Sequence, residues 1–114
     1  MNILKFDLSV IEATNRNVLT NDDNFDLLFD YNEYSKTNIV LEPGSEYQSI
    51  SFANVTSPFL LIASSDREIN FKINGVEYTN CRRLVLNIPI ESVEVLNTKT
   101  YDTTVKISIY GVQQ

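Results

Sequence analysis

Residues 69–78 read Ile-Asn-Phe-Lys-Ile-Asn-Gly-Val-Glu-Tyr, and this stretch decides the fold class. Apolar and polar residues alternate on both sides of Asn74-Gly75, which is the period of a β-strand with one buried face. An Asn-Gly pair tolerates the positive φ angles of a type I′ turn, which joins two antiparallel strands directly. The stretch therefore predicts an antiparallel β-hairpin with its turn at Asn74 and Gly75.

The same two-residue period continues in both directions along the chain. The run from Pro58 to Ala63 is apolar throughout, as expected of a central strand that is covered on both faces. A further strand is expected over residues 37–41, closed by the turn pair Pro43-Gly44. The other residues expected on buried strand faces are Leu4, Phe6, Leu8, Val10, Phe25, Leu27, Phe29, Tyr31, Ile50, Phe52, Leu84, Leu86, Ile88, Val93, Val95, Val105, Ile107 and Ile109.

Eight or nine short strands without a convincing amphipathic helix predict an all-β fold, an antiparallel β-sandwich of jelly-roll type. Residues 22–33 are the main ambiguity, because acids followed by Leu27-Leu28 can also open a short helix, although a strand is preferred. The chain has 114 residues and no linker-like segment. We therefore expect a single β-sandwich domain over residues 1–114.

The charge of the chain is uneven and excludes two classes of partner. The net charge is −6, with nine acids against three bases in residues 1–57 and six of each in residues 58–114. Nucleic-acid binding needs a basic stripe, and Arg82-Arg83 is the only adjacent basic pair, so no nucleic-acid partner is expected. The uncharged segment 47–65 is too polar to cross a bilayer, and no membrane partner is expected.

Residues of the common catalytic and metal sites are scarce. The chain has no histidine, one cysteine and three widely separated glycines, which removes the usual general base, structural zinc and phosphate loop. We therefore expect no enzymatic activity and no cofactor. An oxygen-rich cluster leaves two interpretations open, a calcium site or a solvated acidic surface, and its spacing does not match an EF-hand. This cluster consists of Asp22, Asp23, Asn24, Asp26, Asp30 and Glu33.

Two groups of residues are candidates for contacts between protein chains. Arg82 and Arg83 could clamp a carboxylate of a neighbouring subunit through their planar donor groups, the alternative being two solvated charges. The acidic N-terminal half, in which Leu28 interrupts the polar positions, is expected to meet a more basic partner surface. The candidate assembly contacts are Asp22, Asp23, Asp26, Leu28, Asp30, Arg82 and Arg83.

From Pro58 onward, the order of strands and turns resembles that of small β-rich virion proteins of tailed bacteriophages. The resemblance rests on an apolar strand that ends in Ser64-Ser65-Asp66, on the hairpin with the Asn74-Gly75 turn, and on the strand 84–86. It continues in the paired strands 92–97 and 105–111. The N-terminal half of the chain is not part of this resemblance.

The resemblance implies a structural protein of the particle, in the capsid surface, the head-to-tail connector or the tail. Such proteins bind copies of themselves and neighbouring virion proteins, so a homo-oligomer with virion partners is expected, made in the host cytoplasm. Two alternatives stay open. One is a free-standing carbohydrate-binding or adhesin module with the same sandwich, and the other is a small regulator that binds one host protein.

Overall fold

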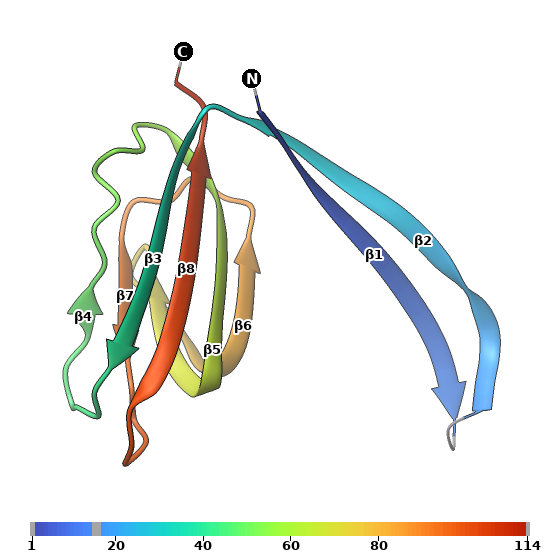
Figure 1. Ribbon diagram of the computed structural model, residues 1–114. Coiled ribbons are helices and arrows are strands. Elements are labelled where there is room, and N and C mark those ends of the chain that lie inside the picture. Colours follow the sequence, from blue (N-terminus) through green and yellow to red (C-terminus); the bar gives the residue numbers. More distant parts are fainter. Residues whose placement is uncertain (1, 15–16, 114) are drawn as a thin grey trace. The chain divides into compact units, whose positions relative to one another are not determined.

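The protein is described by a computed structural model, which covers residues 2–14 and 17–113 and the side chains of residues 2–5 and 28–113. The eight strands in this part of the chain are β1 (Asn2–Thr14), β2 (Asn17–Tyr31), β3 (Glu33–Leu41), β4 (Gln48–Ser49), β5 (Pro58–Ile73), β6 (Val76–Leu86), β7 (Val93–Leu96) and β8 (Thr103–Gly111) (Figure 1). Every ladder between them is antiparallel, and the described residues contain no helix. The all-β antiparallel prediction is confirmed, whereas the jelly-roll form stays a prediction.

The hairpin of β1 and β2 forms a two-stranded sheet of its own, and its strands are longer than the sequence predicts, with 13 and 15 residues. Residues 22–31 belong to β2, so the strand interpretation of this segment is correct. The register places Leu4 opposite Phe29, Phe6 opposite Leu27 and Leu8 opposite Phe25. The alternating apolar positions of the two strands therefore share one face of the hairpin.

The chain divides into two compact units, Met1–Tyr31 and Asn32–Gln114, and the second contains a six-stranded sheet. The long strand β5 organises this sheet, because its first half pairs with β8 and its second half with β7. β6 pairs with β5 along both halves. The sheet therefore curls into two facing layers, as in a β-sandwich (Figure 1). The single domain expected over residues 1–114 stays a prediction.

The bend in β5 lies at the polar residues 64–68, and the resemblance given above implies that a strand ends here, at Ser64-Ser65-Asp66. The structure instead continues one 16-residue strand, because pairing with β8 extends to Ser65 and pairing with β6 resumes at Ile69. Between these points β5 has more residues than the facing part of β6, so the hairpin bends there. The prediction of two separate strands was therefore wrong at this position.

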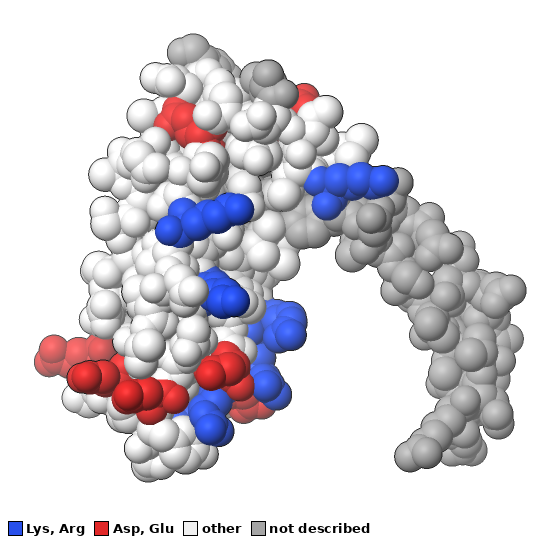
Figure 2. Space-filling view, viewed as in Figure 1, with Lys and Arg blue, Asp and Glu red and all other residues white. Residues whose placement is uncertain are grey.

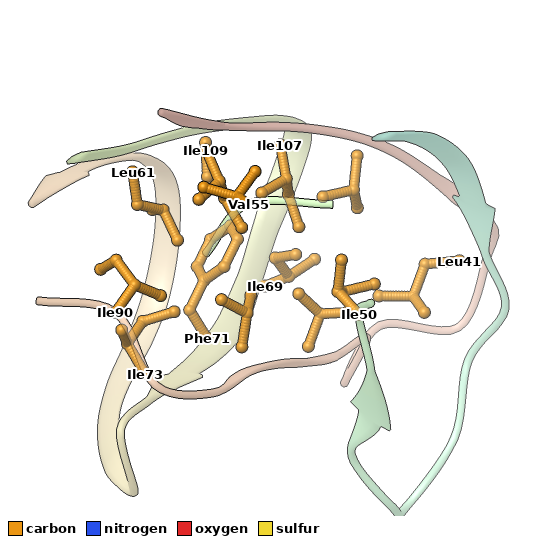
Figure 3. Close-up of a cluster of buried hydrophobic side chains, with 14 residues drawn as sticks. Leu41, Ile50, Val55, Leu61, Ile69, Phe71, Ile73, Ile90, Ile107 and Ile109 are labelled. Atoms are coloured by element: carbon orange, nitrogen blue, oxygen red, sulfur yellow. The ribbon is translucent and has the colours of Figure 1, made fainter. Parts of the chain in front are cut away.

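The hydrophobic core lies between the two layers of this sheet (Figure 3). Side chains alternate in burial along β5 and β8, and the inward positions of these strands meet those of β7. Phe71 is fully buried, with 0% of its surface exposed. The main buried residues of the core are Leu41, Ile50, Val55, Leu61, Ala63, Ile69, Phe71, Ile73, Ile90, Val93, Val95, Val105, Ile107 and Ile109.

The turn between β5 and β6 confirms the prediction made from Asn74-Gly75. Both residues have positive φ angles, 53° at Asn74 and 81° at Gly75, as a type I′ turn requires. The Asn74 side chain also fixes the segment before β7: its Oδ1 accepts from the N–H groups of Glu91 and Ser92, at 2.6 Å and 3.1 Å. Its Nδ2 donates to the carbonyl of Pro89 at 2.8 Å.

Replacement of the turn glycine should destabilise the sheet. We expect Gly75→Val to lower the free energy of unfolding by about 1–2 kcal/mol, because a left-handed backbone conformation is strained for an L-residue. A Cβ at position 75 meets no atom within 4 Å, so the effect isolates the backbone cost. Gly44→Val is the matched control, since Gly44 also has open space and lacks a positive φ. Equal urea midpoints for the two variants would contradict this account of the turn.

A buried asparagine connects two separate segments of the chain. Asn97 follows β7 and has 1% of its surface exposed. Its Nδ2 donates to the carbonyls of Leu41 and Tyr101, at 2.9 Å and 2.8 Å. Its Oδ1 accepts from the backbone N–H of Lys99 at 2.9 Å. The carboxamide is thus satisfied inside the protein, and it joins the end of β3 to the loop before β8.

Candidate interaction surface

Three cations lie on the outer surface of the layer formed by β3, β8, the first half of β5 and the second half of β6. Across the sheet, Lys106 is opposite Asn38 on one side and Ser64 on the other, and Ser64 is opposite Arg83. Lys36 lies in the neighbouring row. We call this surface the basic face; it consists of Lys36, Asn38, Ile62, Ser64, Arg83, Val85, Lys106 and Ser108.

The basic face follows from the alternation of the strands. Because the inward positions of β8 and β5 fill the core, Lys106 and Ser64 take the outward positions between them. Neighbouring strands lie about 4.8 Å apart, so the backbones at Lys106 and Arg83, which are two strands apart, are about 10 Å apart. This spacing suits the recognition of several anionic groups on one extended partner.

The acid beside the basic face is Asp66, which lines the same hollow as Arg83 and Lys106 and whose Oδ1 accepts from the N–H of Thr104. Figure 2 shows Lys and Arg side chains down the surface of β3 and β8, with Asp and Glu side chains toward its two ends. Open hollows on either side of Lys106 leave its ammonium group accessible. The arrangement can attract carboxylates or other anions, and it holds no grouping of catalytic type.

The basic face also carries apolar surface. Val85 has 56% of its surface exposed and lies opposite the half-buried Ile62. In the described part of the chain, β6 pairs only with β5, so its other edge has backbone groups without a strand partner. An exposed edge beside apolar and cationic side chains is a surface on which another polypeptide can dock.

The two predicted arginines have different surroundings. Arg82 is used within its own chain, because its Nη2 donates to the carbonyl of Asp66 at 2.9 Å. Asp66 is itself fixed, since its Oδ1 accepts from the N–H of Thr104 at 3.0 Å. Nearby, the guanidinium carbon of Arg67 lies 4.0 Å from the centroid of the Tyr101 ring. Of the predicted pair, only Arg83 therefore belongs to the basic face.

The acidic candidates lie on the hairpin. Asp30 and Leu28 are exposed, Leu28 with 63% of its surface, and they lie opposite Ile3 and Lys5. The side chains of Asp22, Asp23 and Asp26 lie outside the described residues. Their backbone positions are in β2, where Asp23 is opposite Val10 and Asp26 is opposite Asp7.

The calcium hypothesis concerns the same segment. Among the side chains that the structure describes, no group of three Cys, Asp or Glu residues could hold a metal ion. The side chains of Asp22 to Asp26 were not part of that set, so the choice between a calcium site and a solvated acidic surface stays open.

The outer surface of the other layer differs in charge. Lys72 of β5 lies between Glu77 and Glu94, and its Nζ is 5.3 Å from the centroid of the Tyr47 ring. Burial of the Tyr47 hydroxyl raises its pKa, and the charge of Glu77 and the hydrogen bond to it raise the pKa further. This layer presents more acids than bases at these positions.

Tyr47 predicts how stability responds to alkaline pH. Because the folded state holds the Tyr47 proton more tightly than the unfolded state, the unfolded state ionises first above about pH 10. Stability from this group is therefore present below that pH and is lost as the pH rises. We expect Tyr47→Phe to reduce the loss of unfolding free energy between neutral and alkaline pH in urea titrations. An unchanged pH dependence would contradict the assignment.

Sequence reasoning missed Lys36 and Lys106, which are the other two cations of the basic face. They lie far apart in the chain, and no local motif marks either of them. The only signal was that each occupies a polar position of an alternating strand. Pairing of β3 with β8, which cannot be derived from those strands alone, brings them together.

Comparison with known proteins adds no further constraint on the role of these surfaces. Among the residues that the structure describes, there is no helix long and apolar enough to span a bilayer. No protein-family model, no curated protein and no solved structure matches the chain.

Proposed function

We propose that the chain is a non-enzymatic structural component of a bacteriophage particle, where it acts through protein–protein contacts. Its position would be associated with the capsid, with the head–tail connector or with the tail. The virion is its proposed location, after synthesis in the host cytoplasm. Its partners would be further copies of itself and other virion proteins.

The observation that carries the proposal is the β1–β2 hairpin. A two-stranded hairpin is at best marginally stable in water, and stable ones have a third strand or another packed surface. Within residues 2–14 and 17–113 this hairpin forms a sheet of two strands, and exposed Ile3 and Leu28 lie on one of its faces. A long two-stranded ribbon needs a further packed surface, and assembly with neighbouring chains would provide one.

Two further features support the same proposal. The sequence from Pro58 onward resembles small virion proteins; of the features quoted for that resemblance, the Asn74-Gly75 turn is present, whereas the strand expected to end at Ser64-Ser65-Asp66 continues as β5. The basic face combines exposed cations, exposed Val85 and a strand edge. These properties suit an interface that is buried on assembly.

The proposal is tested by the protein content of purified particles. A phage carrying this sequence is grown, and its particles are purified on a density gradient and washed in high salt. Quantitative mass spectrometry should find the chain at a constant ratio to the other particle proteins across gradient fractions. An abundant host cytoplasmic protein serves as the carry-over control. A chain that stays in the lysate, or falls with the control during washing, would overturn the proposal.

A further inference from the structure

We infer that the β1–β2 hairpin of one copy docks on the basic face of a second copy of this chain. The inference rests on the proposed function and names one of its partners. It concerns the hairpin face opposite the one shared by Leu4, Phe6 and Phe29. We call this surface the acidic face; by register it consists of Ile3, Lys5, Asp7, Asp26, Leu28 and Asp30.

The register of the hairpin contains an unfavourable pair that a partner would relieve. Asp7 and Asp26 occupy directly opposite positions in the ladder. Like charges at opposite positions destabilise a pair of strands, because the two residues are the closest cross-strand neighbours. A cationic partner surface would lower the repulsion between two acids at such positions. The acidic face is therefore expected to bind a cationic surface.

The basic face matches the acidic face in charge and in apolar content. By register the acidic face has three acids and one base, whereas the basic face has the three cations Lys36, Arg83 and Lys106, with the single acid Asp66 at its end. Each face also exposes an aliphatic side chain, Leu28 on the hairpin and Val85 on the sheet. Opposite charges around an apolar centre are typical of protein interfaces.

A second copy is the occupant that the chain itself provides. The unit Met1–Tyr31 contains six acids and two bases, so every copy has one strongly acidic hairpin and one basic face. Contacts between two different surfaces of identical chains run head to tail, and they close into rings or extend into filaments. Each copy would then use both surfaces, one for each neighbour.

Charge reversal on the two surfaces provides the test. Sedimentation velocity of the full chain compares the unmodified protein with a basic-face variant, Arg83→Glu with Lys106→Glu, and a hairpin variant, Asp26→Lys with Asp30→Lys. We expect the unmodified chain to associate, and more weakly at high salt, because salt screens exposed charges. Each variant alone should associate at least about tenfold more weakly, since like charges would then face each other.

An equal mixture of the two variants gives the sharpest result. The acidic hairpin of the basic-face variant can dock on the unchanged basic face of the hairpin variant, and the reversed hairpin of the second can dock on the reversed face of the first. Both contacts again join opposite charges, so the mixture should form dimers and larger alternating assemblies that neither variant forms alone. The control variant, Glu42→Lys with Glu46→Lys, makes the same change in net charge as the hairpin variant on the exposed loop after β3 and should associate like the unmodified chain.

Three results would overturn the inference: an unmodified chain that is monomeric at every concentration, variants that associate like the unmodified chain, or a mixture that forms no dimer. A variant whose circular dichroism shows that it has not folded is replaced by Arg83→Gln or Asp30→Asn, for which the same outcomes hold in weaker form. A monomeric chain that is still found at constant ratio in purified particles would refute this contact and leave the proposed function standing.

Discussion

Phe71→Ala is expected to lower the free energy of unfolding of the six-stranded unit by about 3–5 kcal/mol, because it removes a fully buried aromatic side chain and leaves a cavity. Phe71 lies in the second half of β5, where its ring packs between the two layers (Figure 3). A loss of this size is a large part of the stability of a small domain. Urea denaturation followed by circular dichroism measures it.

The control for the core prediction is a residue of the same sheet that points outward. Val40 of β3 is exposed, so Val40→Ala should change stability by less than about 0.5 kcal/mol. Similar unfolding midpoints for Phe71→Ala and Val40→Ala would contradict the placement of Phe71 in the core between the two layers.

Asn97→Leu should cost about 3 kcal/mol of unfolding free energy, although leucine has a similar size and is more apolar. The substitution leaves the carbonyls of Leu41 and Tyr101 and the N–H of Lys99 without their partner. Each buried polar group that loses its hydrogen bond costs about 1–3 kcal/mol, and some of this is recovered where water reaches the loop. Thermal or urea unfolding of the purified variant measures the loss.

Asn38→Leu is the matched substitution at an exposed position of β3. It makes the same chemical change without uncovering buried polar groups, and we expect little effect on stability. A stabilised Asn97→Leu variant would show that Asn97 does not hold the end of β3 to the loop before β8.

The local features of the fold could be predicted from the sequence because they depend on neighbouring residues. Alternation of apolar and polar residues predicts the strands, and it correctly prefers a strand over a helix for residues 22–31. The turn at Asn74 and Gly75 follows from the φ angles that the two residues tolerate. These predictions required no knowledge of which strands pair.

The features that failed or were missed depend on pairing between distant segments. Residues 64–68 look like a turn, yet β8 and β6 flank them and keep β5 continuous through the bend. Asn97 looks like a loop residue, and only the approach of Leu41 from β3 makes it a buried connection. Neither arrangement has a signature within a few residues of the position concerned.

The candidate surface shows the same division. Composition alone located the acidic excess in the N-terminal half, and Leu28 and Asp30 are indeed exposed there. Arg82 and Arg83 are adjacent in sequence, but the bend at Asp66 engages Arg82 and leaves Arg83 on the outer surface. The partners of Arg83 on that surface, Lys36 and Lys106, could be found only from the order of the strands.

The contact between copies can be tested most directly by zero-length cross-linking. A carbodiimide joins carboxylates to amines that touch, and a mixture of unlabelled and nitrogen-15-labelled chains distinguishes links between copies from links within one chain. The account predicts mixed-isotope products that join a hairpin peptide containing Asp26 or Asp30 to a peptide containing Lys36 or Lys106. Products of a single isotope only, or links from the hairpin to other lysines only, would contradict it.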